Sequence, residues 1–78
     1  MSNVTIYSTP FCVYCKMAKT FFAKKNIAYQ DKDVASDVPA REEMMKKSGQ
    51  MGVPVIDIDG KIIIGFDKPK LQELLHIK

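Results

Sequence analysis

The chain has 78 residues, of which 46% are hydrophobic and 27% charged, and this composition predicts one small folded domain over residues 1–78 rather than a disordered tail or a membrane protein. Its net charge of +3 comes from lysines spread along the whole sequence, so we do not expect nucleic-acid binding, which usually concentrates arginines and aromatic side chains on one face. Two cysteines form at most one bridge and cannot alone bind a structural zinc ion, so neither a disulfide scaffold nor a zinc finger is expected.

The first predicted element is a strand from Val4 to Ser8, where apolar and polar residues alternate before Thr9-Pro10. No basic segment followed by an apolar stretch, as in a signal peptide, precedes it, and no apolar run approaches the roughly 18 residues of a membrane span. We therefore expect a cytoplasmic protein that does not bind membranes. In that reducing compartment, two closely spaced cysteines indicate redox or metal chemistry rather than a structural bridge.

A helix is predicted from Cys12 to Asn26, because this stretch contains neither glycine nor proline and its apolar residues recur at helical spacing. The residues of its predicted core face are Met17, Ala18, Phe21 and Phe22. Weak alternation from Ile27 to Val34 predicts a second strand. A second helix is predicted at about Val38 to Ser48, with Asp37 at its start and Gly49 at its stop.

Two strand-like runs, Pro54 to Ile58 and Lys61 to Ile64, are separated by Asp59-Gly60. This dipeptide is typical of a type I′ turn, so the two runs are predicted to form a hairpin. Asp67 is suited to cap a last helix. The residues expected to face inward from that helix are Leu71, Leu74 and Leu75.

The order of these elements, β-α-β-α-β-β-α, predicts an α/β fold. Two strands joined by a helix form a right-handed crossover and lie parallel, and the hairpin adds two antiparallel strands. We therefore expect a four-stranded mixed sheet with three helices that cover both of its faces.

The chemistry of the chain is predicted to lie in Cys12-Val13-Tyr14-Cys15, between the first strand and the first helix. A C-x-x-C pair is also half of a zinc site, but a second pair or two histidines would be needed and only His76 is present, so no metal site is expected. The partial positive charge of a helix N-terminus favours a thiolate. Cys12 is thus the predicted nucleophile, and Cys15, one turn further on, is predicted to resolve the mixed disulfide.

Three segments point to a known family. They are Val4-Thr5-Ile6-Tyr7-Ser8-Thr9 before the cysteine motif, Gly52-Val53-Pro54-Val55 before the hairpin, and Gly65-Phe66-Asp67 before the last helix. Over essentially the whole chain, the sequence resembles a glutaredoxin or glutaredoxin-like redoxin of the thioredoxin-fold superfamily. The resemblance implies a thioredoxin-like fold and thiol–disulfide exchange by Cys12 and Cys15.

The resemblance also implies a binding site for glutathione or substrate beside the cysteines. It implies a cis Val53–Pro54 bond, pairing of the Val53 backbone with the substrate, and a loop at Asp67 that holds the γ-glutamyl end of glutathione. The residues implied for this site are Tyr14, Val53, Pro54, Gly65, Phe66, Asp67 and Lys68. Glutathione would then be a co-substrate, and no tightly bound cofactor is expected.

Val13 leaves the electron donor open, because the common glutaredoxin motif has proline at this position. Val13 is similar to NrdH-type redoxins, which accept electrons from thioredoxin reductase and reduce ribonucleotide reductase. A third alternative is a binding module in which Cys12 and glutathione from two chains hold an iron–sulfur cluster. The expected partners are glutathione, thioredoxin reductase or both, together with proteins that contain disulfides, and the expected state is a monomer.

Overall fold

The structure, a computed structural model, describes residues 3–76. These residues form β1 (Val4–Ser8), α1 (Val13–Lys24), β2 (Gln30–Asp33), α2 (Val38–Ser48), β3 (Val55–Ile58), β4 (Lys61–Ile64) and α3 (Lys68–Leu75). The element order confirms the predicted α/β class. Within the described residues, no helix has the length and hydrophobicity needed to cross a bilayer.

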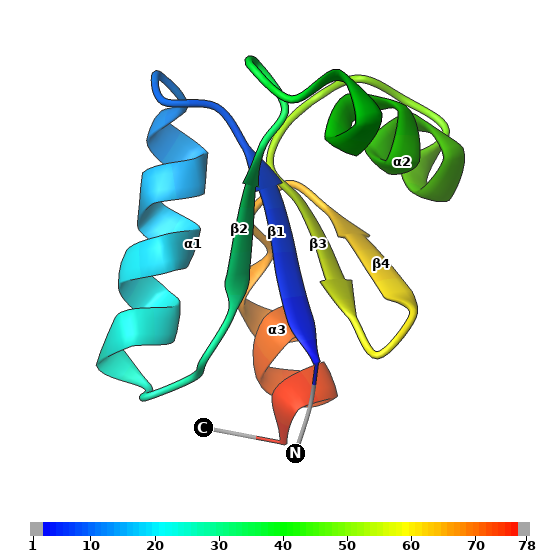
Figure 1. The fold of residues 1–78 in the computed structure, drawn as a ribbon. Helices are drawn as coiled ribbons and strands as arrows, with labels where there is room; N and C mark the ends of the chain where they lie inside the picture. Colours follow the sequence, from blue (N-terminus) through cyan, green and yellow to red (C-terminus); the bar gives the residue numbers. More distant parts are fainter. Residues whose placement is uncertain (1–2, 77–78) are drawn as a thin grey trace.

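The four strands form one mixed sheet in the order β2-β1-β3-β4, with β1 parallel to β2 and the other pairs antiparallel (Figure 1). Tyr7 lies opposite Val55, and Val55 lies opposite Ile64. The segments that follow β1, precede β3 and follow β4 therefore meet at one end of the sheet. The cysteine motif, the Val53–Pro54 segment and the loop before α3 all lie in these segments.

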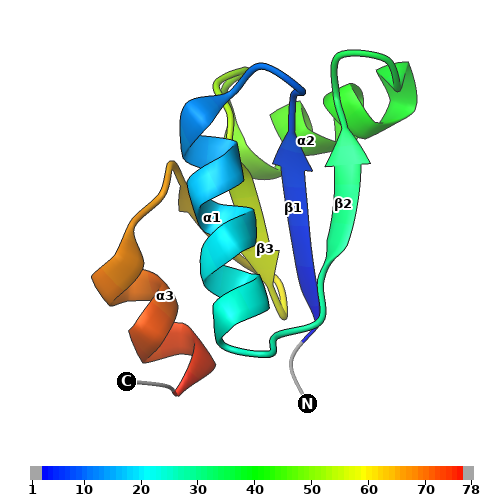
Figure 2. The same cartoon turned by 90° about the vertical axis from the view of Figure 1, so that its left-hand side faces the viewer.

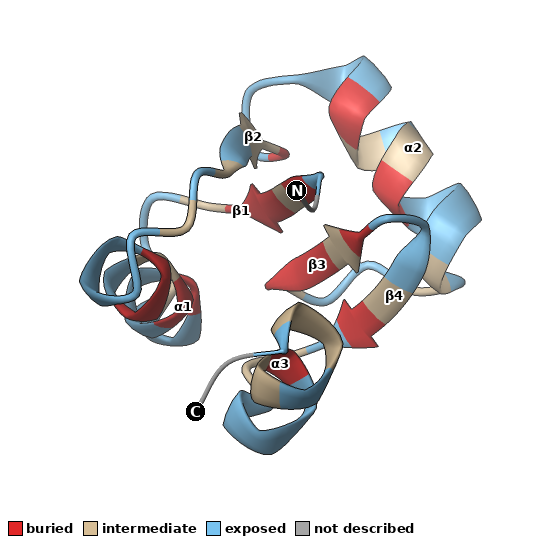
Figure 3. Cartoon of the chain, turned by 90° about the horizontal axis from the view of Figure 1, so that it is seen from below, coloured by how far each residue is buried: buried red, intermediate tan, exposed pale blue. Residues whose placement is uncertain are grey.

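The helices cover both faces of the sheet, as predicted. α1 and α3 lie beside each other on one face, and α2 lies on the other (Figures 2 and 3). Since side chains alternate along a strand, each face has its own core. The core under α1 and α3 consists of Val4, Ile6, Ala18, Phe21, Phe22, Ile56, Ile58, Ile63 and Leu71. The core under α2 consists of Tyr7, Val34, Ala40, Met44 and Val55.

Local chemistry sets several element ends where the sequence predicts them. Asp37 caps α2 by accepting a hydrogen bond from the Ala40 N–H at 3.1 Å, and Gly49 ends this helix with a φ of 73°. Asp59 and Gly60 have φ angles of 52° and 90°, the positive values that a type I′ turn requires. The predicted bounds of α2 and of β4 are confirmed.

The predicted bounds of three elements were wrong. β3 begins at Val55 rather than at Pro54, and β2 ends at Asp33 rather than at Val34. α1 begins at Val13 with Cys12 as its N-cap, and it ends at Lys24. β2 begins at Gln30 rather than at Ile27, because the Ile27 N–H is bonded to the Phe22 carbonyl at 2.9 Å in the turn that ends α1.

A polar cluster on the α2 face surrounds the buried Tyr7. The Tyr7 hydroxyl donates a hydrogen bond to Glu43 and accepts one from Lys47 at 3.0 Å. Lys47 also binds Asp57 at 2.7 Å, and Lys32 binds Glu43 at 3.2 Å. The hydrogen bonds from Tyr7, Lys32 and Lys47 lower the pKa of Glu43 from 4.5 to about 2. The charged form of Glu43 therefore stabilises the folded state.

The lowered pKa of Glu43 predicts how the free energy of unfolding depends on pH. Because the folded-state pKa is lower than the unfolded one, the contribution of Glu43 is present above about pH 4.5 and is lost as the pH falls toward 2. We expect the free energy of unfolding of Glu43→Gln, measured with urea, to approach that of the wild type as the pH falls. The exposed neighbour Glu42→Gln is the control and should follow the wild type. A Glu43→Gln deficit that is the same at neutral and acidic pH would contradict the prediction.

Candidate active site

Cys12 occupies the N-cap of α1. Its backbone is extended, with φ −90° and ψ 115°, and its Sγ accepts a hydrogen bond from the Cys15 N–H at 3.1 Å. An N-cap side chain takes one of the N–H groups that a helix leaves unpaired at its start, and a negatively charged sulfur is favoured there. Cys12 is half-buried, and both cysteines are free thiols. Its sulfur is therefore held at the helix start by the same backbone that positions Cys15.

Cys15 is fully buried in the first turn of α1. Burial, and then the hydrogen bond and charge of Cys12, raise the pKa of the Cys15 thiol from 9.0 to about 12. A hydrogen bond from the Thr9 backbone and the charge of Lys19 act in the opposite direction. The two cysteines of one motif therefore differ in exposure, and the thiol of Cys15 is held in its protonated form.

Behind Cys15, three elements contribute a polar cluster of Ser8, Lys19 and Asp31. Lys19 of α1 binds Asp31 of β2 at 2.6 Å, and the buried Ser8 of β1 donates a hydrogen bond to the same carboxylate at 2.6 Å. Lys19 lies four residues after Cys15, on the same side of the helix. Its charge favours the thiolate of Cys15, while Asp31 holds the ammonium group in place.

The Val53–Pro54 bond is cis, as the resemblance implied. The Pro54 carbonyl accepts a hydrogen bond from the Gly65 N–H at 2.8 Å, and this bond ties the end of β4 to the start of β3. The hydrogen bonds between described residues leave the Val53 N–H and carbonyl unpaired, and Val53 is half-buried. A backbone edge is thus available at the end of the sheet where the cysteine motif lies.

Three more residues predicted for the site, Phe66, Asp67 and Lys68, lie in the loop before α3 or at the start of that helix. The Asp67 carboxylate caps α3 by accepting a hydrogen bond from the Lys70 N–H at 3.2 Å. The Phe66 ring packs edge-on against Phe21 of α1, and Lys68 is exposed. Tyr14, two residues after Cys12 in the motif, is also exposed.

The apolar surface around Cys12 was not predicted from the sequence. Phe11 is 92% exposed, and Val13 is also largely exposed. Met17 was predicted on the core face of the helix, but this was wrong, because it is 45% exposed. The hydrophobicity of Phe11 and Val13, directly beside Cys12 in the sequence, was the signal that could have indicated this surface. The spacing of four residues between Cys15 and Lys19 could have indicated Lys19 as a residue of the site. Its partner Asp31 could not be found in this way, because the pairing of β2 with β1 brings Asp31 to Lys19.

Comparisons with known proteins agree on one family. The glutaredoxin family model matches residues 4–63. A glutaredoxin-like 8.6 kDa protein in the rubredoxin operon of Clostridium pasteurianum is 50% identical, covering 94% of this chain and 97% of that protein. Glutaredoxin 3 of Escherichia coli K12 is 40% identical, covering 86% of this chain and 81% of its own. The crystal structure of a mutant of the thioredoxin-like protein BC3987 superimposes with a TM-score of 0.93 at 35% identity, with both chains fully covered.

The asymmetry of the two thiols predicts selective alkylation. When the reduced protein is treated with iodoacetamide at neutral pH, we expect Cys12 to be modified at least about a hundredfold faster than Cys15, because Cys15 is buried and its pKa is raised to about 12. Peptide mapping by mass spectrometry over time measures both rates, and Cys15→Ser, which keeps Cys12, is the control. Equal rates at the two cysteines would refute this assignment.

Proposed function

The chain belongs to the glutaredoxin family, and on that basis we propose that it is a dithiol–disulfide oxidoreductase that acts through Cys12 and Cys15. Glutaredoxins carry out thiol–disulfide chemistry with glutathione as a co-substrate. The observation that most supports the proposal is the unequal placement of the two sulfurs, one at the capped start of α1 and one buried behind it.

In the proposed reaction, the Cys12 thiolate attacks one sulfur of a substrate disulfide. The disulfide bond breaks, its other sulfur leaves and takes up a proton, and a mixed disulfide joins Cys12 to the substrate. Cys15 then loses its proton and attacks the Cys12 sulfur. The second substrate thiol is released, and a Cys12–Cys15 disulfide forms. The substrate gains two electrons, and the motif loses two.

The residues around the cysteines have proposed supporting roles. The unpaired N–H and carbonyl of Val53 would bind the substrate backbone in the manner of an added strand, and cis Pro54 would hold that edge toward the motif. Tyr14 would form one wall of the site. The loop at Gly65-Phe66-Asp67 would receive the γ-glutamyl end of glutathione at the start of α3.

Lys19 is proposed to assist the second step as a positioning residue. The buried Cys15 must become a thiolate to attack, and Lys19 is the cation that favours this form. Asp31, which accepts a hydrogen bond from Ser8, holds Lys19 beside β2.

The first test of the mechanism uses the cysteine variants. Cys12→Ser should abolish turnover, because no nucleophile remains at the helix start. Cys15→Ser should instead accumulate the mixed disulfide, which mass spectrometry of the intact protein detects. Full turnover of a protein disulfide by Cys12→Ser would contradict the proposal.

The second test concerns the resolving step. Lys19→Met should slow the decay of a preformed mixed disulfide at neutral pH several-fold, and the rise of this rate with pH should move to higher pH, because the Cys15 thiolate loses the favourable charge of Lys19. Lys19→Arg should restore much of the rate, and Lys16→Met on the same helix is the control. An unchanged pH profile in Lys19→Met would assign Lys19 a structural role only.

The third test identifies the electron donor. Two coupled assays with the same protein and a small disulfide are needed, one with glutathione and glutathione reductase and the other with thioredoxin reductase. We expect measurable but modest turnover with glutathione, because this chain departs from the common glutaredoxin pattern at four positions, Thr9, Val13, Ile64 and Lys68. Turnover only with thioredoxin reductase would place the protein with NrdH-type redoxins.

A further inference from the structure

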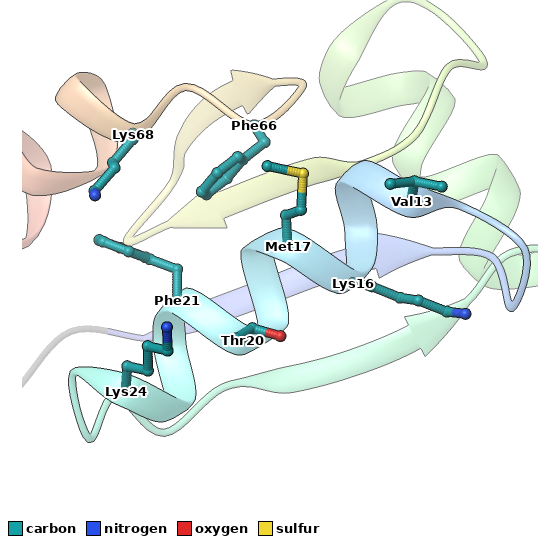
Figure 4. A pocket seen from close by; sticks show the side chains of 8 residues that line it. All are labelled: Val13, Lys16, Met17, Thr20, Phe21, Lys24, Phe66 and Lys68. Atoms are coloured by element: carbon teal, nitrogen blue, oxygen red, sulfur yellow. The ribbon is translucent and has the colours of Figure 1, made fainter.

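An apolar groove runs along α1 away from the cysteine motif. Its volume is about 500 Å³, and it is lined by Val13, Lys16, Met17, Thr20, Phe21, Lys24, Phe66 and Lys68 (Figure 4). The packed rings of Phe21 and Phe66 form its apolar part, and Met17 points toward Phe66. The groove begins at Val13, directly beside Cys12.

The charge of this groove has one sign. Among residues 3–76, its lining includes three lysines and no carboxylate. The ion pairs between residues 3–76 involve Lys19, Lys32 and Lys47, so none of the three groove lysines is neutralised by a described residue. Figure 4 shows Lys24 and Lys68 near Phe21, at the far end from Val13, whereas Lys16 points away from the aromatic rings. The far end therefore favours an anion next to an apolar group.

The distance between Cys12 and Lys24 indicates which class of ligand can reach both residues. Lys24 lies twelve residues after Cys12, and a helix rises 1.5 Å per residue, so the two positions are about 18 Å apart along α1. An extended chain spans this length with about five or six residues. In glutathione both carboxylates lie within one residue of the cysteine, so glutathione bound at Cys12 does not reach Lys24.

We propose that this groove binds an acidic segment of the protein whose disulfide is reduced, with an apolar side chain on Phe21 and Phe66 and carboxylates at Lys24 and Lys68. This inference rests on the proposed function, and it adds the class of substrate: a disulfide whose cysteine lies five or six residues from acidic residues, with an apolar residue between them.

The test compares synthetic peptides. Each has one cysteine in a mixed disulfide with 2-mercaptoethanol, a leucine three residues away, and either two glutamates or two glutamines at the fifth and sixth positions from the cysteine. Because the direction of the segment is open, each peptide is made in both sequence orders. We expect the wild-type protein at low salt to reduce the glutamate peptide of one order about fivefold faster than its glutamine counterpart, and we expect high salt to remove the difference.

Variants of the protein locate the effect. Within each variant the ratio of the two rates is compared, so that changes in intrinsic activity cancel. Lys24→Gln/Lys68→Gln should bring the ratio close to one. Lys46→Gln/Lys61→Gln removes the same charge from α2 and from the start of β4, and it should keep the preference. A ratio of one in the wild type for both orders, or equal loss in both double variants, would overturn the proposal.

A binding experiment separates this proposal from the proposed function. Peptides with serine in place of cysteine are titrated into the reduced protein, and the amide chemical shifts are followed by nuclear magnetic resonance. Shifts along α1 and at Phe66 with the glutamate peptide alone would support the groove even if no disulfide were reduced. Reduction of small disulfides without such shifts would support the oxidoreductase and refute the groove.

Discussion

The hydrogen bond from the Cys15 N–H to the Cys12 sulfur depends on where α1 begins, and the chemistry of the site follows from that point. Because the helix starts at Val13, Cys12 keeps an extended backbone outside it, and Cys15 lies in its first turn facing the sheet. A spacing of three residues thus places one sulfur at the surface and the other in the interior. The sheet then brings the Val53 edge and the loop before α3 to the same end.

Elements whose ends depend on local chemistry were predictable from the sequence. Asp37 and Gly49 bound α2, and Asp59-Gly60 forms the hairpin turn, because cap and turn residues act within a few positions of themselves. The start of β2 was not predictable, since it depends on how far the turn after α1 extends. The exposure of Met17 was missed because helical spacing shows an apolar stripe but not how much of its width neighbouring elements cover.

The cysteines of the candidate site were predictable because a C-x-x-C motif at the start of a helix favours a reactive thiolate. The cluster behind them was not, because Ser8, Lys19 and Asp31 belong to three elements and meet only through strand pairing. The same limit applies to Tyr7, whose side chain is buried in β1. Its hydroxyl nevertheless bonds to α2, so each face of β1 combines apolar packing with a polar network.

The outer strand β2 is attached differently from the rest of the sheet. None of the residues of Gln30–Asp33 is buried. Apart from the ladder with β1 and the hydrogen bond from Ser8 to Asp31, two ion pairs between described residues hold the strand, Asp31 with Lys19 on one face and Lys32 with Glu43 on the other. Dissolved salt screens partly exposed charges but leaves apolar packing intact. The β2 edge of the sheet therefore responds to ionic strength, and through Lys19 that response reaches the buried sulfur of Cys15.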